Sequence, residues 1–428
     1  MATPALGAAK LYQGYYLISS TVLSWYMPKQ TKRIKKTPTV LDIFCGAGGM
    51  SLGFQNAGCE ILGGIDNNPH AIKTHHDNFP NSKLSKLNFG AQDIGDIDLL
   101  ELPIKPGDVD ILIGGPPCQV FSVVGMGKMK SLGKQIQSDT RNFLYKYFII
   151  FLRYYKPIFF VVENVNTLKN NAIFSTLTRE LEEGLPAHRH DYPGYDVKYQ
   201  ILLASDYGVP QLRKRLFIVG RRKDTNLSFE FPKKNTSTPV SVGEAIGDLP
   251  ELEPISMPLR QKMSGPKQKD VEKPYRYPPK PGYQQNMRSK KKEGEGVINH
   301  ICRAHNEKDL AIFEMLSQGG KYMDLPELLR RYRDDIFEDK YKRFKWDEPS
   351  WTLTAHMRKD CLAYIHPTQT RSISVREAAR LQSFPDDFVF YAPMTRMFEL
   401  VGNSVPPLVA QAIAEPIVEQ IQAYYASL

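Results

Sequence analysis

The sequence predicts an α/β fold in which a doubly wound mixed sheet is joined to a second, smaller and irregular domain. From Thr39 onward, short apolar runs rich in β-branched residues alternate with helical patterns, and this alternation ends after Arg222. Alternation of this kind is typical of a sheet whose connecting helices cover both faces. The length of 428 residues exceeds one average domain and favours two compact units.

Six buried strands are expected, each a short apolar run. They cover 39–44, 60–66, 109–115, 158–165, 199–205 and 215–220. Helices are expected between several of them, over 49–57, 69–78, 141–155 and 174–183. A later helix over 374–384 begins with a capping box of Ser374 and Glu377, and a last one over 406–425 contains Pro416, which should kink or divide it.

The composition favours a soluble protein of the cytoplasm. Hydrophobic residues make up 42% and charged residues 24%, and no apolar run reaches the ~18 residues that cross a bilayer. The N-terminus lacks the features of a secretory signal, and the apolar stretch 11–27 is expected to pack as a helix or strand, with membrane contact as the alternative. Five cysteines without a C-x-x-C pair indicate reduced thiols and disfavour structural zinc. His70, His75 and His76 are expected on a helix surface rather than on a metal.

The charge distribution indicates a polyanionic partner. The formal net charge is +10, and the segment 255–300 alone contains 11 Lys or Arg against 4 Asp or Glu. A local basic excess of this kind fits nucleic acid.

Acidic residues and glycines follow the first predicted strands, where sheets of this class bind their ligands. The run from Leu41 to Met50, LDIFCGAGGM, is a strand that enters a glycine turn and a helix. Its G-A-G-G spacing differs from the G-x-G-x-x-G of pyrophosphate binding. Asp66 is suited to holding two ribose hydroxyls, and Asp93, where a third strand should end, could bind an exocyclic amine. A nonspecific turn with solvated acids is the alternative.

Cys118 lies in the run GGPPCQVFS (114–122), directly after a predicted strand. Two prolines before the thiol would hold it rigidly at the sheet edge, as covalent attack on an electron-poor ring requires. A lone cysteine is more often a small core residue, but the flanking prolines and the following segment favour a nucleophile. That segment, 119–141, is rich in Gly, Lys and Arg and is expected to form a basic lid over a phosphate backbone.

Two further polar segments accompany the strands. Glu163 ends the fourth predicted strand, where a protonated carboxyl could hydrogen-bond a ring nitrogen; a solvated or salt-bridged carboxylate is the alternative. The run QLRKR (211–215) should place Arg213 and Arg215 on one face, suited to a carbonyl oxygen or a phosphate; a solvated basic edge is the alternative.

Together these segments resemble the cytosine-5 DNA methyltransferase family of bacterial type. The matching segments, in the family's order, are DIFCGAGGMSLGF (42–54), GIDNNP (64–69), GGPPCQVFS (114–122), ENV (163–165), YGVPQLRKRLFIVG (207–220), SVREAARLQSFPD (374–386) and VGNSVPP (401–407). The resemblance implies a catalytic domain over 39–224 and 372–428, of the S-adenosylmethionine-dependent methyltransferase fold. It implies a target-recognition domain over 225–371, and leaves 1–38 as an extension without an assigned role.

The resemblance also implies the cofactor and its pocket. The cofactor would be S-adenosylmethionine, with S-adenosylhomocysteine as product and no metal. Phe44 would stack on the adenine, Asp66 would hold the ribose, and Asp93 with Ile94 would contact the adenine. The implied cofactor residues are Phe44, Gly46, Gly48, Asp66, Asn67, Asp93, Ile94, Pro117, Leu144, Asn403, Ser404 and Val405.

By the same resemblance the target cytosine would be flipped out of the duplex. Cys118 would attack carbon 6, Glu163 would hold nitrogen 3 and the amino group, and Arg215 would hold the ring carbonyl, while Arg213 would support the closed lid or a phosphate. The implied DNA contacts are Gln119, Ser122, Lys128 and Arg141. The expected partner is double-stranded DNA. The enzyme is expected to be a monomer without membrane contact. A cognate restriction endonuclease that acts on the same site is a second candidate partner.

Three alternatives remain. A tRNA cytosine methyltransferase on the same core would need a short recognition segment, whereas this chain has ~150 residues between its last predicted strand and the 374–384 helix. A nucleic-acid-binding protein without catalysis would rest on the basic stretch 255–300 and would not need Cys118, Glu163 and Arg215. An oxidoreductase is disfavoured by the glycine spacing.

Overall fold

The computed structural model describes residues 37–117, 144–236, 238–256, 271–330 and 341–428. The expectations for the extension 1–38 and for the apolar stretch 11–27 therefore fall almost wholly outside the described residues, as does the lid 119–141.

A six-stranded mixed sheet forms the centre of the molecule, with strand order β2-β1-β3-β4-β7-β5. The strands are β1 (Thr39–Ile43), β2 (Glu60–Ile65), β3 (Ile111–Gly114), β4 (Phe159–Val165), β5 (Tyr195–Leu203) and β7 (Lys214–Arg222). The first four pair in parallel, whereas β7 is antiparallel to both of its neighbours, β4 and β5. Strands form at all six predicted positions. β5 begins four residues earlier than the expected start at 199, and the expectation that it is buried is wrong, because most of its residues are exposed at the edge of the sheet.

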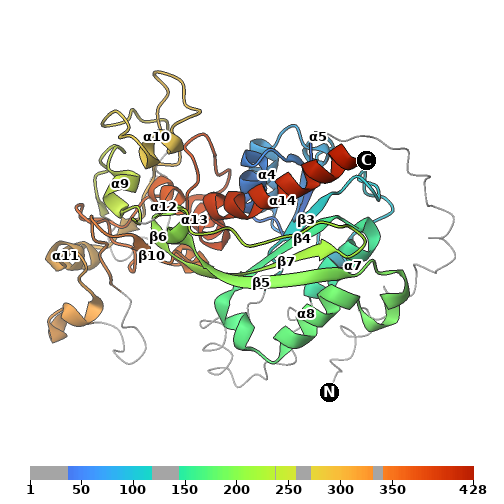
Figure 1. The fold of residues 1–428 in the computed structure, drawn as a ribbon. Coiled ribbons are helices and arrows are strands. Elements are labelled where there is room, and N and C mark those ends of the chain that lie inside the picture. The colour runs from blue at the N-terminus through green and yellow to red at the C-terminus, as the bar shows by residue number, and fades with distance from the viewer. Residues whose placement is uncertain (1–36, 118–143, 237, 257–270, 331–340) are drawn as a thin grey trace, which may run out of the picture.

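Both faces of the sheet are buried at the inner strands β1, β3, β4 and β7, because these strands are apolar on both sides. In β4, Phe159 and Val161 join one hydrophobic cluster, and Phe160 and Val162 join the other. The first cluster includes α3 (Gly49–Asn56), α4 (Pro69–Asn78) and α14 (Pro407–Ser427), and the second includes α7 (Tyr145–Tyr155) and α8 (Ile173–Glu183). Figure 1 shows α14 on one side of the sheet and α7 and α8 on the other. The doubly wound α/β prediction is confirmed.

The C-terminal helices lie close to their predicted ranges. Helix α12 (Val375–Leu381) has the predicted capping box, in which Ser374 Oγ accepts from Glu377 N at 3.0 Å. Helix α13 (Met394–Asn403) was not predicted. Pro416 does not divide α14, which runs unbroken over 21 residues, so that part of the expectation is wrong.

The expectation of a third strand ending at Asp93 is also wrong. Asp93 instead caps the short 3-10 helix η1 (Ile94–Asp96), where its Oδ1 accepts from Gly95 N at 3.0 Å. The segment before it lies against the end of β2, since Gln92 N donates to the Asp66 carbonyl at 3.1 Å. The Asp93 side chain accepts a hydrogen bond from the backbone N–H two residues further on, and this favours a turn over an extended strand.

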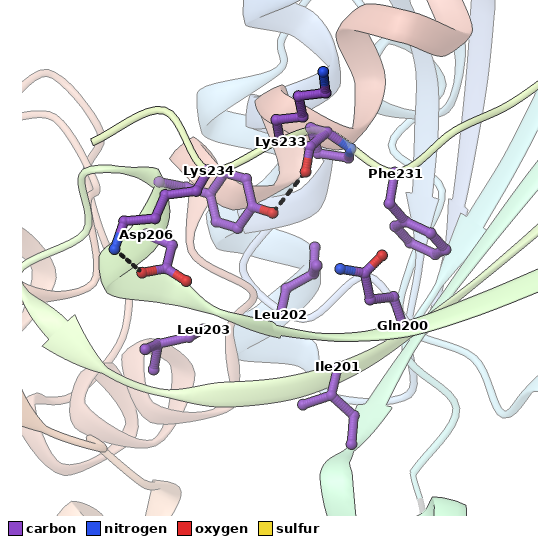
Figure 2. A pocket seen from close by; sticks show the side chains of 10 residues that line it. Gln200, Ile201, Leu202, Leu203, Asp206, Phe231, Lys233 and Lys234 are labelled. Carbon is purple, nitrogen blue, oxygen red and sulfur yellow. Dashed lines mark hydrogen bonds and ion pairs between the residues drawn. The ribbon is translucent and has the colours of Figure 1, made fainter. Parts of the chain in front are cut away.

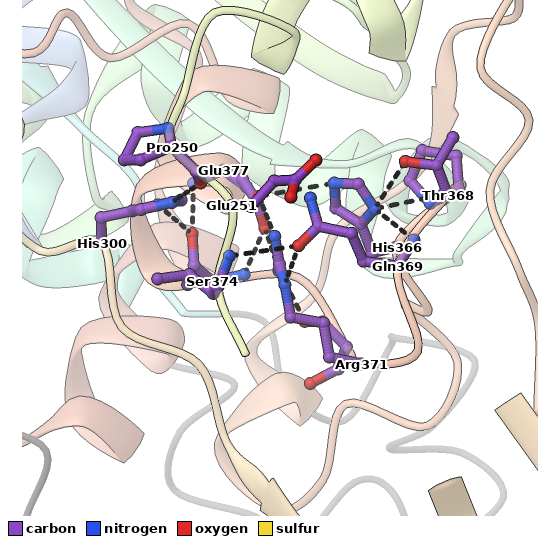
Figure 3. Close-up of polar contacts among 12 residues, drawn as sticks. Pro250, Glu251, His300, His366, Thr368, Gln369, Arg371, Ser374 and Glu377 are labelled. Carbon is purple, nitrogen blue, oxygen red and sulfur yellow. Dashed lines mark hydrogen bonds and ion pairs between the residues drawn. The ribbon is translucent and has the colours of Figure 1, made fainter. Parts of the chain in front are cut away.

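The described residues of the region 225–371 form only short elements, as its irregular sequence predicts. They are α9 (Val242–Ile246), β8 (Ile255–Ser256), α10 (Tyr283–Met287), β9 (Ala304–His305), α11 (Glu307–Met315), η7 (Tyr322–Asp324), η8 (Glu327–Leu329), β10 (Ser350–Trp351) and η9 (Ala355–Arg358). Buried ionic contacts join this region to α12: Arg371 donates to both oxygens of Glu377 at 2.7 Å (Figure 3). The domain boundaries at 225 and 371 stay a prediction.

Candidate active site at the carboxyl edge of the sheet

The loop 44–48 between β1 and α3 turns sharply at the carboxyl edge of the sheet. Phe44, Gly46 and Gly48 all have positive φ, at 59°, 54° and 94°. At Gly48 a Cβ atom would lie 2.7 Å from the Phe79 ring and 2.9 Å from the ring of His75. Both the conformation and the lack of space therefore require glycine at this position.

Asp66, directly after β2, holds this loop in place. Its carboxylate accepts from Gly46 N at 3.0 Å and from Asn68 N at 2.8 Å. Burial raises the pKa of Asp66, although the backbone N–H donors counteract the shift. Asn67 beside it is exposed, as is Asp93, while Ile94 is buried. Asp93 and Ile94 lie close to Asp66 because the backbone N–H of the neighbouring Gln92 donates a hydrogen bond to the Asp66 carbonyl.

The sequence-distant segment Asn403–Val405 returns to the same loop. A Cβ on Gly49, the first residue of α3, would lie 2.3 Å from the Val405 carbonyl oxygen and 3.3 Å from Ser404 Cβ. Ser404 and Val405 are buried and Asn403 is exposed. Leu144, at the start of α7, packs against the same cluster as Phe44. Asp66, Ser404 and Val405 thus lie against the loop 44–48 or the first residue of α3.

A second group lies at the ends of β3, β4 and β7. Glu163 Oε1 and Arg215 Nε are 3.0 Å apart, and both side chains are largely buried. Burial lowers the pKa of Arg215, and the Glu163 carboxylate counteracts the shift. A Cβ on Gly115 would be 3.4 Å from Glu163 Oε2, and Asn164 Nδ2 donates to the Pro116 carbonyl at 3.1 Å. The segment after β3 is thus held beside Glu163.

Pro117 is the last described residue before the predicted nucleophile. Cys118 and the predicted DNA contacts Gln119, Ser122, Lys128 and Arg141 lie outside the described residues. For these positions the assignments stay predictions.

Arg213 differs from Arg215 in its surroundings. It lies between the short strand β6 (Gln211–Leu212) and β7, and its side chain is buried among backbone carbonyls. It donates to the carbonyls of Leu353 at 2.7 Å, Gly402 at 3.2 Å and Ser404 at 3.3 Å. Burial lowers the pKa of Arg213 to about 9. The guanidinium thus ties the Asn403–Val405 segment to the region 225–371.

Sequence reasoning missed a buried polar group beneath the loop. Contrary to the expectation of a surface histidine, His75 is fully buried, and its Nε2 is 3.1 Å from Ser51 Oγ. Ser51 Oγ in turn donates to Asp42 Oδ2 at 2.6 Å. Helical spacing contained the signal, because His75 shares a face of α4 with the buried Ala71 and Phe79.

A cavity of about 320 Å³ lies elsewhere, between the end of β5 and the segment 231–234 (Figure 2). Its lining includes the ion pair of Lys234 with Asp206, 3.0 Å apart, and Tyr207, whose hydroxyl donates to the Pro232 carbonyl at 2.9 Å. None of the predicted site residues lines it.

Neither a metal-binding cluster nor a membrane-spanning helix is present among the described residues. No three His, Cys, Asp or Glu side chains in the described ranges are grouped so that they could hold a metal ion. Among the helices of those ranges, none is long and apolar enough to cross a membrane.

Comparisons with known proteins indicate the same family as the sequence motifs do. Residues 38–419 match the family model described as C-5 cytosine-specific DNA methylase. The chain is 33% identical over 416 residues to the type II methyltransferase M1.HphI of Haemophilus parahaemolyticus, a match that covers 95% of this chain and 96% of the relative. It is 33% identical over 398 residues to the type II methyltransferase M.DdeI of Desulfomicrobium norvegicum, covering 88% of each. A solved prophage-encoded protein of E. coli, provisionally named a DNA modification methyltransferase, has a TM-score of 0.67 and 26% identity, covering 90% of this chain and 99% of that chain.

Proposed function

The chain belongs to the C-5 cytosine-specific DNA methylase family, and from this premise we propose that it methylates carbon 5 of cytosine in a specific sequence of double-stranded DNA. The observation that carries the proposal is the convergence of two groups at one sheet edge: the loop held by Asp66, and the Glu163–Arg215 pair beside the segment that leads to Cys118.

The residues around the loop fit S-adenosylmethionine as methyl donor. A carboxylate offers about four acceptor positions, and two backbone N–H groups occupy only part of the capacity of Asp66, so ribose hydroxyls can use the rest. Phe44 is partly exposed and offers a ring for the adenine. A Cβ on Gly46 would meet nothing within 4 Å, which leaves open space beside the loop. When bound, the donor supplies an electrophilic methyl group.

The chain's own residues would prepare the base. The cytosine leaves the stack, because carbon 6 is inaccessible inside a duplex. Cys118 Sγ, as a thiolate, forms a bond to carbon 6, while Glu163 holds nitrogen 3 and the amino group and Arg215 holds the ring carbonyl. The electron pair that reaches carbon 5 takes the methyl group; carbon 5 then loses its proton, and the Cys118 thiolate leaves carbon 6. Arg213 acts as a positioning residue, through the carbonyls of the Gly402 and Ser404 backbone.

The biological setting is proposed from the relatives. M1.HphI and M.DdeI are both named type II methyltransferases, which places them in restriction-modification. We infer the same role here, with a restriction endonuclease that cuts the same site when it is unmethylated.

Bisulfite sequencing of DNA from cells that express the protein tests the proposal. Protection of cytosines in one recurring sequence context is the expected result, and the Cys118→Ala variant should lose it while retaining DNA binding. Turnover by Cys118→Ala close to that of the parent would remove Cys118 as nucleophile. Methylation of tRNA by the purified protein, with none of DNA, would favour the related RNA enzymes instead.

A further inference from the structure

Three polar side chains below the loop 44–48 form a continuous buried chain. Asp42 lies on β1, Ser51 in the first turn of α3 and His75 on α4, and all are at most 1% exposed. Ser51 Oγ donates to Asp42 Oδ2 at 2.6 Å and is 3.1 Å from His75 Nε2. The three elements that surround the loop are thus joined from beneath.

The direction of these hydrogen bonds follows from the number of protons. A serine hydroxyl has one hydrogen, and Ser51 gives it to Asp42. When Asp42 is ionised, the contact with Ser51 is then a hydrogen bond that His75 donates from Nε2–H. Burial lowers the pKa of His75 to about 3, which keeps the ring neutral. Nδ1 of His75 has no hydrogen-bond partner among the described residues, so Ser51 is the contact that orients the ring.

The His75 ring also fills the space between two glycines. A Cβ on Gly64 of β2 would lie 2.7 Å from His75 Nε2, and one on Gly48 would lie 2.9 Å from His75 Cδ2. The ring packs on Phe79 with centroids 4.6 Å apart. Close packing transmits a displacement of such a ring to its neighbours. A change in the orientation of His75 would therefore move Gly48.

We propose that the buried chain Asp42–Ser51–His75 positions the loop 44–48 for the methyl donor, and that Ser51 and His75 are positioning residues that determine donor affinity. The inference rests on the proposed function, since it assigns the loop to the donor. Asp66 holds the loop from the open side through Gly46 N. The buried chain joins the strand before the loop, at Asp42, to the helix after it, at Ser51, on the other side.

Substitutions at Ser51 and His75 test the inference by isothermal titration with S-adenosylhomocysteine and by steady-state methylation of DNA. Ser51→Ala removes only the hydroxyl. His75→Leu removes the hydrogen bond, whereas His75→Gln retains an N–H that can reach Ser51. Ile72→Ala is the matched control, because Ile72 is a buried residue of the same helix outside the chain of hydrogen bonds.

We expect Ser51→Ala and His75→Leu to weaken S-adenosylhomocysteine binding and raise the donor KM about tenfold, the effect of one lost buried hydrogen bond, with kcat at saturating donor within about twofold. His75→Gln should restore binding to within about threefold of the parent, and Ile72→Ala should leave it unchanged. If His75→Leu does not fold, Ser51→Ala decides the question.

The inference is overturned if the parent binds S-adenosylhomocysteine and Ser51→Ala binds it equally well. It is also overturned if folded His75→Gln is as weak as His75→Leu, since shape rather than hydrogen bonding would then position the loop. A parent that binds no S-adenosylhomocysteine would instead contradict the proposed function itself.

Discussion

Glu163 and Arg215 meet across two antiparallel strands, with 3.0 Å between Oε1 and Nε. The pairing of β4 with β7 sets Glu163 opposite Phe217 and Arg215 opposite Val165, so the two side chains approach diagonally. Each is at most 16% exposed, and a second carboxylate oxygen lies near Gly115. The pair is thus assembled by the sheet itself, next to the segment that leads to Cys118.

Because the two residues hold each other, their substitutions should not be additive. We expect Glu163→Gln and Arg215→Met each to lower kcat by at least about 100-fold, since each removes an interaction with the developing charge on the base. The double variant should be little worse than either single one. Asp196→Asn, in the ion pair of Asp196 with Arg221 between β5 and β7, is the matched control and should retain full activity. Glu163→Gln with the kcat of the parent would falsify the assignment.

Asp66 should control donor affinity. Asp66→Ala removes the acceptor for Gly46 N and for ribose hydroxyls, so we expect the Kd for S-adenosylhomocysteine to rise at least about tenfold, with DNA affinity unchanged. Because burial raises the pKa of Asp66, its carboxylate is lost earlier on acidification than that of an ordinary aspartate, and donor affinity should fall as pH falls. Titration calorimetry measures both effects.

The control for Asp66 is Asp98→Ala. Asp98 is an exposed acid that also accepts from a backbone N–H, that of Leu100 at 2.9 Å. Unchanged donor affinity in Asp66→Ala would remove Asp66 from the pocket, whereas an equal loss in both variants would show a general effect of removing acidic charge.

The side chain of Arg213 is expected to contribute mainly to the free energy of unfolding. Arg213→Met removes the guanidinium donor to the carbonyls of Leu353 and Gly402 and one of the two side-chain donors to Ser404, which should cost about 3 kcal/mol in free energy of unfolding. Arg358→Met is the control, because its ion pair with Glu399 is partly exposed and should be worth less than about 1 kcal/mol. Urea unfolding of the two variants compares them directly, and equal stability would contradict the role given to Arg213.

Sequence patterns predicted the sheet well because each strand contains a short apolar run, and the inner strands β1, β3 and β4 are buried on both faces. They failed where a single side chain decides the local structure. Asp93 caps η1 rather than ending a strand, and α14 accommodates Pro416 without interruption.

The sequence predicted which residues belong to the site, but not how their side chains are arranged. Family motifs identified Glu163 and Arg215, but their ion pair depends on the antiparallel insertion of β7, which no local pattern reveals. The spacing of four residues between His75 and the buried Phe79, which directly follows α4, could have predicted the burial of His75. Its contact with Ser51, in contrast, depends on how α3 and α4 pack.

Stability should fall on mild acidification. Figure 3 shows His300 and His366 among the polar contacts around Glu377. Burial lowers the pKa of His300 to about 4 and that of His366 to about 3, so both are neutral in the folded protein. The unfolded chain binds protons at histidine below pH ~6.5, and the free energy of unfolding therefore decreases as pH falls from ~6.5 towards these values. The buried His75 and His305 have lowered pKa values as well and act in the same direction.

The double variant His300→Gln/His366→Gln tests this pH dependence. Its Tm should fall less than that of the parent between pH 7 and pH 5, because two of the proton-binding groups are gone. His190→Gln, at an exposed position, is the control and should follow the parent. A double variant whose Tm falls as steeply as that of the parent would show that other groups determine acid sensitivity.

Exchanging 225–371 for the same segment of a relative with a known target should transfer sequence preference, as bisulfite sequencing would record. The buried contacts across this boundary include two ion pairs, Arg371 with Glu377 at 2.7 Å and Asp248 with Arg380 at 2.9 Å. A replacement segment without Arg371 leaves the buried Glu377 without its arginine partner, at a cost of about 3–5 kcal/mol. Loss of Asp248 costs less, because Arg380 keeps its buried ion pair with Asp386 at 2.7 Å. The exchange should therefore retain Arg371 and Asp248, and a chimera without them should have a lower Tm. If the folded chimera still methylates the parent's sequence, target choice resides outside 225–371 and the domain division is wrong.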